Sequence, residues 1–225
     1  MLILGIETSC DETAAAVLEG SPSTSSGSTS RIQILSNVVA SSAQLQAKYG
    51  GIIPEQAARE QIKSIIPVIE EALIQAFKIP TGSHLRGVLK SEASRHLGGG
   101  TGIDAIAVTF GPGLIGSLLV GVETAKVLAK IWNKPLIPVN HLLGHFYANW
   151  IDNPSSLRDP DFIGTKQSIT KKVATSGRSI DPPRNDKSVV PSFPCIGLLV
   201  SGGHTDLVLF TSHGKYTYLG GTRDD

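Results

Sequence analysis

The most constraining feature of the sequence is an apolar stretch without charges, from Ala105 to Val122. Its length approaches that of a membrane-spanning helix. However, Gly111-Pro112-Gly113 lies in its middle, and a proline between glycines breaks a spanning helix. The stretch therefore predicts a buried strand, a tight turn and a buried helix, which is typical of a soluble α/β protein.

Composition places the chain among ordinary globular proteins. Of its 225 residues, 40% are hydrophobic and 17% are charged, which excludes collagen-like, coiled-coil and wholly disordered chains. Lys and Arg number 20 against 19 Asp and Glu, so the net charge is +1. Because there is no global basic field, a nucleic acid would have to be bound by a local patch or with partner proteins.

The cysteines and the N-terminus predict that the protein is found in the cytosol. Cys10 and Cys195 lie far apart in strand-like surroundings, which is no disulfide framework and fits a reducing cytosol. No Lys or Arg precedes Glu7, so a signal peptide is not expected. We expect a cytoplasmic protein with no membrane partner.

Hydrophobic runs predict the elements of an α/β domain. Three segments joined by turns predict an antiparallel meander of strands at 2–7, 14–19 and 32–40. Helical spacing predicts a helix from Pro54, with a kink or two abutting helices at Pro67. Two strand–helix pairs follow, at 104–110 with 114–132 and at 135–139 with 141–150. This order predicts a mixed sheet with helices on its faces.

The pattern restarts near the C-terminus. Residues 152–192 are rich in proline and charge and lack apolar periodicity, so we interpret them as a mobile insertion or linker. Further strands are predicted at 195–200, at 206–210 and from 216 to 219. The predicted organisation is a first domain at 1–151, the insertion at 152–192, and the first strands of a second, incomplete domain at 193–225.

A glycine pattern, Gly111-Pro112-Gly113-Leu114-Ile115-Gly116, follows a predicted strand and opens a helix. It matches the G-x-G-x-x-G of dinucleotide-binding folds. The acid that would bind the ribose about 20 residues later is missing, because no Asp or Glu occurs between Glu123 and Asp152. The pattern therefore favours a turn that packs helix against strand, and leaves open a backbone approach to another phosphate.

Two histidines form a candidate metal site. His141 and His145 are four residues apart on a predicted helix, a spacing at which both imidazoles can reach one ion. The Glu of the zinc-protease motif H-E-x-x-H is absent. A pair of partly exposed histidines at a helix start is the alternative interpretation.

Two polar loops could also carry chemistry. The glycines within Val200–Thr205 allow backbone N–H groups to approach a phosphate or carboxylate, although this stretch taken alone favours an ordinary glycine hairpin turn. Residues 7–13 hold three carboxylates and three hydroxyls, enough to bind a hydrated cation or position a base. A solvated turn is the alternative for this loop.

Five motifs, taken together and in order, resemble one family: GIETSCDETAAAV, GGIIPEQAARE, AVTFGPGLIGSLLVG, PVNHLLGHFYANW and LLVSGGHTDLVL. They are similar to the tRNA N6-threonylcarbamoyladenosine transferase family, the bacterial TsaD and archaeal-eukaryotic Kae-type group, once described as O-sialoglycoprotein endopeptidases. The similarity covers residues 1–20, 32–80, 103–152 and 194–225.

The resemblance implies an actin/Hsp70-like (ASKHA) fold of two ribonuclease-H-like domains, with a mixed five-stranded sheet in the first and the active site between the two. It implies that His141 and His145 are ligands of a metal, with iron expected before zinc. It gives Asp11 and Glu12 a catalytic role, orienting the reacting groups or a cation. It also implies that five residues line the site for the adenylate and the threonylcarbamoyl group: Leu199, Val200, Ser201, Gly202 and Gly203.

The implied reaction is acyl transfer, from threonylcarbamoyl-AMP to N6 of adenosine 37 in tRNAs that read ANN codons. The resemblance further implies magnesium with the nucleotide, and accessory subunits that include a paralogous dimer partner and an ATPase.

The sequence departs from the family pattern in three places. Gln61 stands where family members usually carry His, so the role of that histidine is absent or altered. The insertion at 152–192 is longer than expected. The chain also ends before the family's remaining second-domain residues, among them an Asp that completes the metal site. We therefore expect a fragment or truncated gene product that is not competent alone; a non-catalytic scaffold and a metalloendopeptidase are the alternative functions.

Overall fold

The computed structural model describes residues 1–20, 32–47, 49–79, 102–151, 191–200 and 204–223. Its contacts divide the chain into two compact units, Met1–Gly144 and His145–Asp225, which are described separately below. Most of the insertion predicted at 152–192 lies outside the described residues. In the described part of the chain, no helix is long and apolar enough to cross a bilayer.

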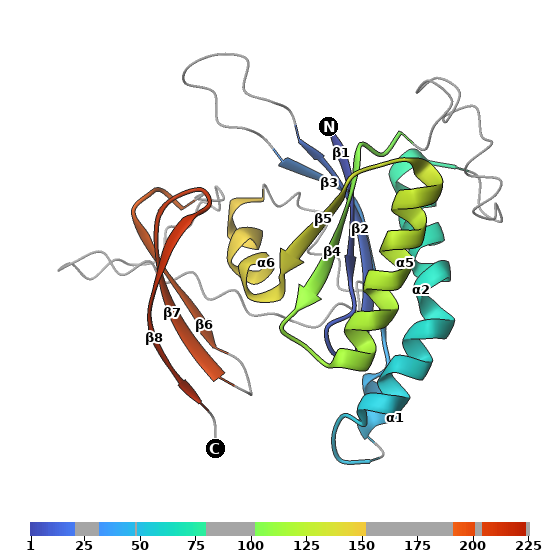
Figure 1. The fold of residues 1–225 in the computed structure, drawn as a ribbon, viewed down its shortest axis with the longest axis horizontal. Coiled ribbons are helices and arrows are strands. Elements are labelled where there is room, and N and C mark those ends of the chain that lie inside the picture. The colour runs from blue at the N-terminus through green and yellow to red at the C-terminus, as the bar shows by residue number, and fades with distance from the viewer. Residues whose placement is uncertain (21–31, 48, 80–101, 152–190, 201–203, 224–225) are drawn as a thin grey trace, which may run out of the picture. The chain divides into compact units, whose positions relative to one another are not determined.

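The first unit is built on a five-stranded mixed sheet of order β3-β2-β1-β4-β5 (Figure 1). Strands β1 (Leu2–Glu7), β2 (Glu12–Gly20) and β3 (Ile32–Ser41) are antiparallel neighbours, which confirms the predicted meander. Strands β4 (Ala105–Gly111) and β5 (Leu136–Asn140) continue the sheet parallel to β1. The predicted mixed sheet is confirmed, with strand boundaries shifted by one or two residues.

Helices α2 (Pro54–Phe77) and α5 (Ile115–Trp132) lie side by side on one face of this sheet (Figure 1). Helix α2 runs unbroken through Pro67, so the predicted alternative of two abutting helices is wrong. A short helix, α1 (Ala43–Ala47), precedes α2 and was not predicted.

The core of the first unit lies between the sheet and these two helices. In β1, Leu4 and Ile6 are buried against the helices, and the alternation of a strand turns Glu7 toward the opposite face. The same alternation in β4 buries Ile106 and Val108 in the core and turns Thr109 to the opposite face. The face without α2 and α5 therefore carries the polar side chains at the strand ends.

The prediction that 114–132 is a buried helix is correct for one side of α5 only. Leu118, Ala125 and Leu128 are buried, whereas Ile115 and Leu119 are 74% and 51% exposed. Apolar composition predicted burial, but part of this apolar surface is not covered by the described residues of the first unit.

The second unit contains an antiparallel sheet of order β6-β7-β8, with β6 (Cys195–Val200), β7 (His204–Ser212) and β8 (Lys215–Arg223). The predicted strands are confirmed, and their assignment to a second, related domain stays a prediction. Helix α6 (His141–Tyr147) and the 3₁₀ turn η1 (Ala148–Trp150) replace the single helix predicted at 141–150. Phe146 of α6 packs edge-on against Phe210 of β7, with ring centroids 5.3 Å apart.

Candidate functional site at the carboxyl ends of the parallel strands

Three polar side chains meet where the parallel strands of the first unit end. Glu7 is the last residue of β1, Thr109 lies near the end of β4, and His141 directly follows β5. Parallel strands end at the same edge of a sheet, and ligands of open α/β sheets bind at that edge. Because α2 and α5 cover one face of the sheet, the three side chains share the opposite face.

The carboxylate of Glu7 is the centre of this cluster. Its Oε2 accepts a hydrogen bond from Thr109 Oγ1 at 2.6 Å and lies 3.2 Å from Nδ1 of His141. Its Oε1 accepts a hydrogen bond from the backbone N–H of Ser9. The Oγ of Ser9 in turn lies 3.1 Å from Nδ1 of His141. Both oxygens of one carboxylate thus connect a strand, a loop and the start of a helix.

The same contacts determine the ionisation of Glu7. Burial alone would raise its pKa, but hydrogen bonds from His141, Thr109 and Ser9 outweigh burial and lower the pKa from 4.5 to about 2. Glu7 is therefore a carboxylate at neutral pH, and an acceptor for the imidazole beside it.

The loop after β1, residues 8–11, is held from the side of α5. Ser117 Oγ donates a hydrogen bond to the Cys10 carbonyl at 2.9 Å, and Thr8 Oγ1 donates to the Ser117 carbonyl at 2.8 Å. The N–H of Leu114 donates to the Ser9 carbonyl at 2.7 Å. These bonds fix the loop backbone before any ligand arrives.

Gln61, the departure from the family pattern, holds this loop from the side of α2. Its side chain is 1% exposed, and its Nε2 donates to the carbonyls of Thr8, Cys10 and Glu12 at 3.4, 3.0 and 3.0 Å. In place of the histidine expected from the resemblance, the chain therefore has an amide that ties α2 to the loop bearing Asp11 and Glu12.

Close packing explains the glycines around the turn after β4. A Cβ at Gly113 would overlap the backbone of Ser9, and a Cβ at Gly121 would overlap the side chain of Thr8. Gly116 of the same helix would meet only Ala58 Cβ, at 3.4 Å. Within the glycine pattern, the interpretation as a packing turn therefore accounts for Gly113, and Gly121 adds a second close approach further along α5.

His141 and His145 both lie on α6, one helical turn apart. Asn140 begins the helix, since its Oδ1 accepts hydrogen bonds from the N–H groups of Leu142 and Leu143 at 2.9 and 3.3 Å. Two imidazoles, one with a carboxylate behind its Nδ1, suit iron or zinc by the chemistry of the donors. Within the described residues, no three His, Cys, Asp or Glu side chains group closely enough to hold an ion. The metal assignment stays a prediction.

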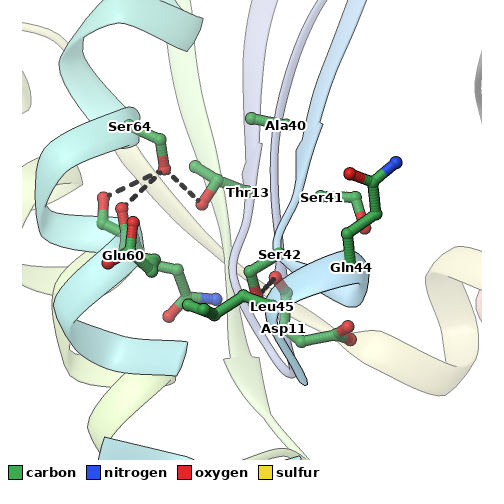
Figure 2. A pocket seen from close by; sticks show the side chains of 10 residues that line it. Asp11, Thr13, Ala40, Ser41, Ser42, Gln44, Leu45, Glu60 and Ser64 are labelled. Atoms are coloured by element: carbon green, nitrogen blue, oxygen red, sulfur yellow. Dashed lines mark hydrogen bonds between the residues drawn. The ribbon is translucent and has the colours of Figure 1, made fainter. Parts of the chain in front are cut away.

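Asp11, predicted to be catalytic, lines a cavity of about 380 Å³ between the loop, β3, α1 and α2. Figure 2 shows Ser64 of α2 hydrogen-bonded to Thr13 at one side of this cavity, with Asp11 and Ser42 at the other. Glu12 is the first residue of β2. The structure brings Glu7 and Ser9 of this loop to His141, and the roles of Asp11 and Glu12 stay predictions.

The predicted substrate-binding residues lie at the end of β6. Leu199 and Val200 are its last residues, and Val200 is 69% exposed. Ser201, Gly202 and Gly203 lie outside the described residues. Their predicted contacts with substrate are therefore untested.

The sequence analysis named Glu7 and Ser9 only as members of the polar loop 7–13, without a role beside His141, and it did not identify Thr109. Glu7 had been counted only among the carboxylates of a polar loop. An acid at the last position of an apolar strand is a usable signal, because the ends of parallel strands converge. Its partner Thr109 gives no such signal, since it is one more residue of an apolar strand.

Residues 33–81 and 99–165 match the family model described as TsaD, tRNA N6-adenosine threonylcarbamoyltransferase. The chain belongs to this family. A relative of that name from Thermomicrobium roseum is 44% identical over 225 residues, which is 100% of this chain and 46% of the relative. Another, from Dehalococcoides mccartyi, is 40% identical over 228 residues, covering 100% of this chain and 49% of the relative. The chain thus spans about half the length of the curated relatives it matches.

Among solved structures, YeaZ from Pseudomonas aeruginosa is similar to 66% of this chain and 49% of its own, at 18% identity and a TM-score of 0.36. A similarity this weak carries no conclusion about fold or partners.

Proposed function

We propose that the protein transfers the threonylcarbamoyl group from threonylcarbamoyl-AMP to N6 of adenosine 37 in tRNAs that read ANN codons. Family membership across both halves of the first unit is the observation that carries this proposal. The polar cluster at the carboxyl edge of the parallel strands supports it, because it joins three of the family-like motifs at a place where α/β proteins bind ligands.

The fold assignment is part of the proposal. A sheet of three antiparallel strands followed by two parallel strands, with α2 and α5 on one face, agrees with an actin/Hsp70-like first domain. The antiparallel sheet β6-β7-β8 then corresponds to the first strands of a second such domain.

In the proposed reaction, the N6 amine of the adenosine attacks the carbamoyl carbon. The bond from that carbon to the phosphate oxygen breaks, AMP leaves with the bonding electrons, and N6 loses a proton. The target base must first leave its stack. We assign Asp11 and Glu12 to orienting the reacting groups or a cation, and residues Leu199 to Gly203 to lining the site for the adenylate.

His141 and His145 would hold the metal, for which we propose iron in preference to zinc. Magnesium would bind together with the nucleotide. When bound, the metal would polarise the carbonyl of the threonylcarbamoyl group. The chain's own contribution is rigidity, because Gln61, Ser117 and Leu114 all bond the backbone of the neighbouring loop.

An accessory subunit is the partner we propose for the exposed side of α2 and α5. An apolar groove of about 520 Å³ runs between these helices, lined by Ile62, Ile66 and Leu119 among others. Ile62, Ile66 and Leu119 are 64%, 40% and 51% exposed. Contiguous aliphatic surface of this kind marks protein interfaces. The family resemblance implies a paralogous dimer partner, and we propose that partner as the occupant of this groove. Binding of tRNA in the cytoplasm by a chain of net charge +1 would then depend on such subunits.

Repression of the chromosomal gene tests the proposed activity. We expect threonylcarbamoyladenosine in total tRNA, measured by nucleoside mass spectrometry, to fall on repression and to return when the native gene product is supplied. A second modified nucleoside of the same tRNAs serves as the control and should not change. Unchanged threonylcarbamoyladenosine in cells that lack the protein would refute the proposal. If the metalloendopeptidase alternative held, the tRNA would be unaffected.

A further inference from the structure

We propose that Glu7 is a positioning residue for His141: its carboxylate holds the Nδ1–H tautomer and thereby directs the lone pair of Nε2 toward a metal ion. The inference rests on the proposed function only in taking His141 as a metal ligand. It concerns a residue that the sequence analysis counted only among the carboxylates of the polar loop 7–13, with no role assigned toward His141.

The geometry at Nδ1 selects the tautomer. Oε2 of Glu7 lies 3.2 Å from Nδ1, and Oγ of Ser9 lies 3.1 Å from it. A carboxylate can only accept a hydrogen bond, so an unprotonated Nδ1 would place two lone pairs against each other. The arrangement therefore favours a proton on Nδ1, which leaves the ligand lone pair on Nε2. Imidazoles that bind metals commonly have a carboxylate in this role.

Glu7 can fix the ring because Glu7 is itself fixed. Thr109 Oγ1 donates to Oε2 at 2.6 Å, and the N–H of Ser9 donates to Oε1. Its backbone belongs to the β1 ladder, paired with Ala14 in β2. The carboxylate is thus held by two neighbouring segments, and the imidazole at the start of α6 is oriented against a rigid acceptor.

Direct ligation of the metal by Glu7 is the competing role, because each carboxylate oxygen keeps a second lone pair beside the hydrogen bond it accepts. The two roles differ in how they depend on His141: a direct ligand acts without that ring, whereas a positioning residue acts only through it. The test below uses this difference.

The test compares Glu7→Gln with the matched control Glu19→Gln in the native gene product. Glu19 lies on the neighbouring strand β2 and is exposed. An amide can either accept from Nδ1–H or donate to an unprotonated Nδ1, so Glu7→Gln removes the selection of one tautomer. Nitrogen-15 NMR of the histidine ring, recorded without metal, should show His141 as the Nδ1–H tautomer in the wild type and in Glu19→Gln, and a mixture in Glu7→Gln.

Metal affinity is the second readout, measured by competition for Zn²⁺ and by the visible absorption of bound Co²⁺. Glu7→Gln should weaken binding by about 10- to 100-fold, the range measured for partners of metal-ligating histidines. In a His141→Ala background the same substitution should add nothing, since the effect acts through that ring. Thr109→Val, which leaves the carboxylate in place but removes one of its donors, should weaken binding less; it serves if Glu7→Gln does not fold.

The outcomes separate this proposal from the proposed function. Wild-type affinity and an unchanged tautomer in Glu7→Gln would overturn the positioning role while leaving the transferase intact. Equal loss of affinity by Glu7→Gln with and without His141 would overturn it as well, because Glu7 would then act elsewhere. If His141→Ala binds metal as tightly as the wild type does, both the assignment of His141 as a metal ligand and this proposal are wrong. The proposed transferase activity is then still tested separately by tRNA modification.

Discussion

Substituting Gln61 by leucine would release the loop between β1 and β2 without altering any of its own residues. The amide of Gln61 is buried in α2 and donates to the carbonyls of Thr8, Cys10 and Glu12. Leucine has a similar volume and no donor. The Cys10 carbonyl keeps the hydrogen bond from Ser117 Oγ, so the substitution deprives the Thr8 and Glu12 carbonyls of a donor.

The contacts set the size of the effect. Each lost hydrogen bond contributes about 0.5–1.5 kcal/mol, and the longer 3.4 Å bond to Thr8 contributes less than the 3.0 Å bonds to Cys10 and Glu12. Leucine also removes Oε1 of Gln61, which is buried without a hydrogen-bond partner in the described part of the chain; its removal offsets part of the loss. The expected net decrease in the free energy of unfolding is about 2 kcal/mol, or about 30-fold in the folding equilibrium.

Urea denaturation of the native gene product measures this difference, and Gln75→Leu is the matched control. Gln75 lies on the same helix, is exposed, and donates only to Glu71 on the helix surface at 2.8 Å. Its substitution should change the free energy of unfolding by no more than about 0.5 kcal/mol. If Gln61→Leu were as stable as Gln75→Leu, the account of how this loop is held would be wrong.

Three further predictions follow from the site and the helices. The pKa of Glu7 is about 2 in the fold against an ordinary value of 4.5, so its ionisation stabilises the fold fully above pH 4.5 and this contribution is lost as the pH falls toward 2. Urea titrations from pH 6 to pH 3 without metal should therefore show a steeper loss of stability for the wild type than for Glu7→Gln. Parallel curves for the two proteins would contradict this. Gly121→Ala should lower the free energy of unfolding by about 1–3 kcal/mol, because the added Cβ would overlap the side chain of Thr8. Gly116→Ala should not lower it. Equal effects of the two substitutions in thermal denaturation would refute the argument that α5 packs closely against Thr8 at Gly121. Leu119→Glu should abolish copurification with the accessory subunit while leaving the melting temperature unchanged, because Leu119 is exposed on α5. The control Gln75→Glu places the same charge elsewhere on the two helices and should still copurify with the subunit. Copurification of both variants with the subunit would show that the interface lies elsewhere.

The sequence predicted the elements better than it predicted their contacts. The strands β1 to β6 follow from apolar runs, because alternation and turn residues act over a few positions. Pro67 did not divide α2, and residues on both sides of it, among them Ile65 and Ile69, are buried in the core against the sheet. The exposure of Leu119 could not be predicted, because an apolar residue can be buried either within its own domain or against a partner protein, and hydrophobicity does not distinguish the two.

In the candidate site too, short sequence motifs could be recognised, whereas contacts between residues far apart in the sequence could not. Loop residues 7–13 and the spacing of His141 and His145 were visible as motifs. The contact of Glu7 with Thr109 and His141 joins residues more than 100 positions apart. It depends on the parallel pairing of β1 with β4 and of β4 with β5, which no local pattern reports.

Reconstitution with purified components tests the central claim most directly. The native gene product, its accessory subunits, threonylcarbamoyl-AMP and an unmodified tRNA that reads an ANN codon are combined, and modified adenosine is measured by mass spectrometry for the wild type and for the His141→Ala/His145→Ala variant. We expect modification by the wild type and none by the variant. Modification by both would contradict the metal role of the histidines, and modification by neither, with the accessory subunits shown to be active alongside another family member, would contradict the transferase itself and favour a non-catalytic scaffold.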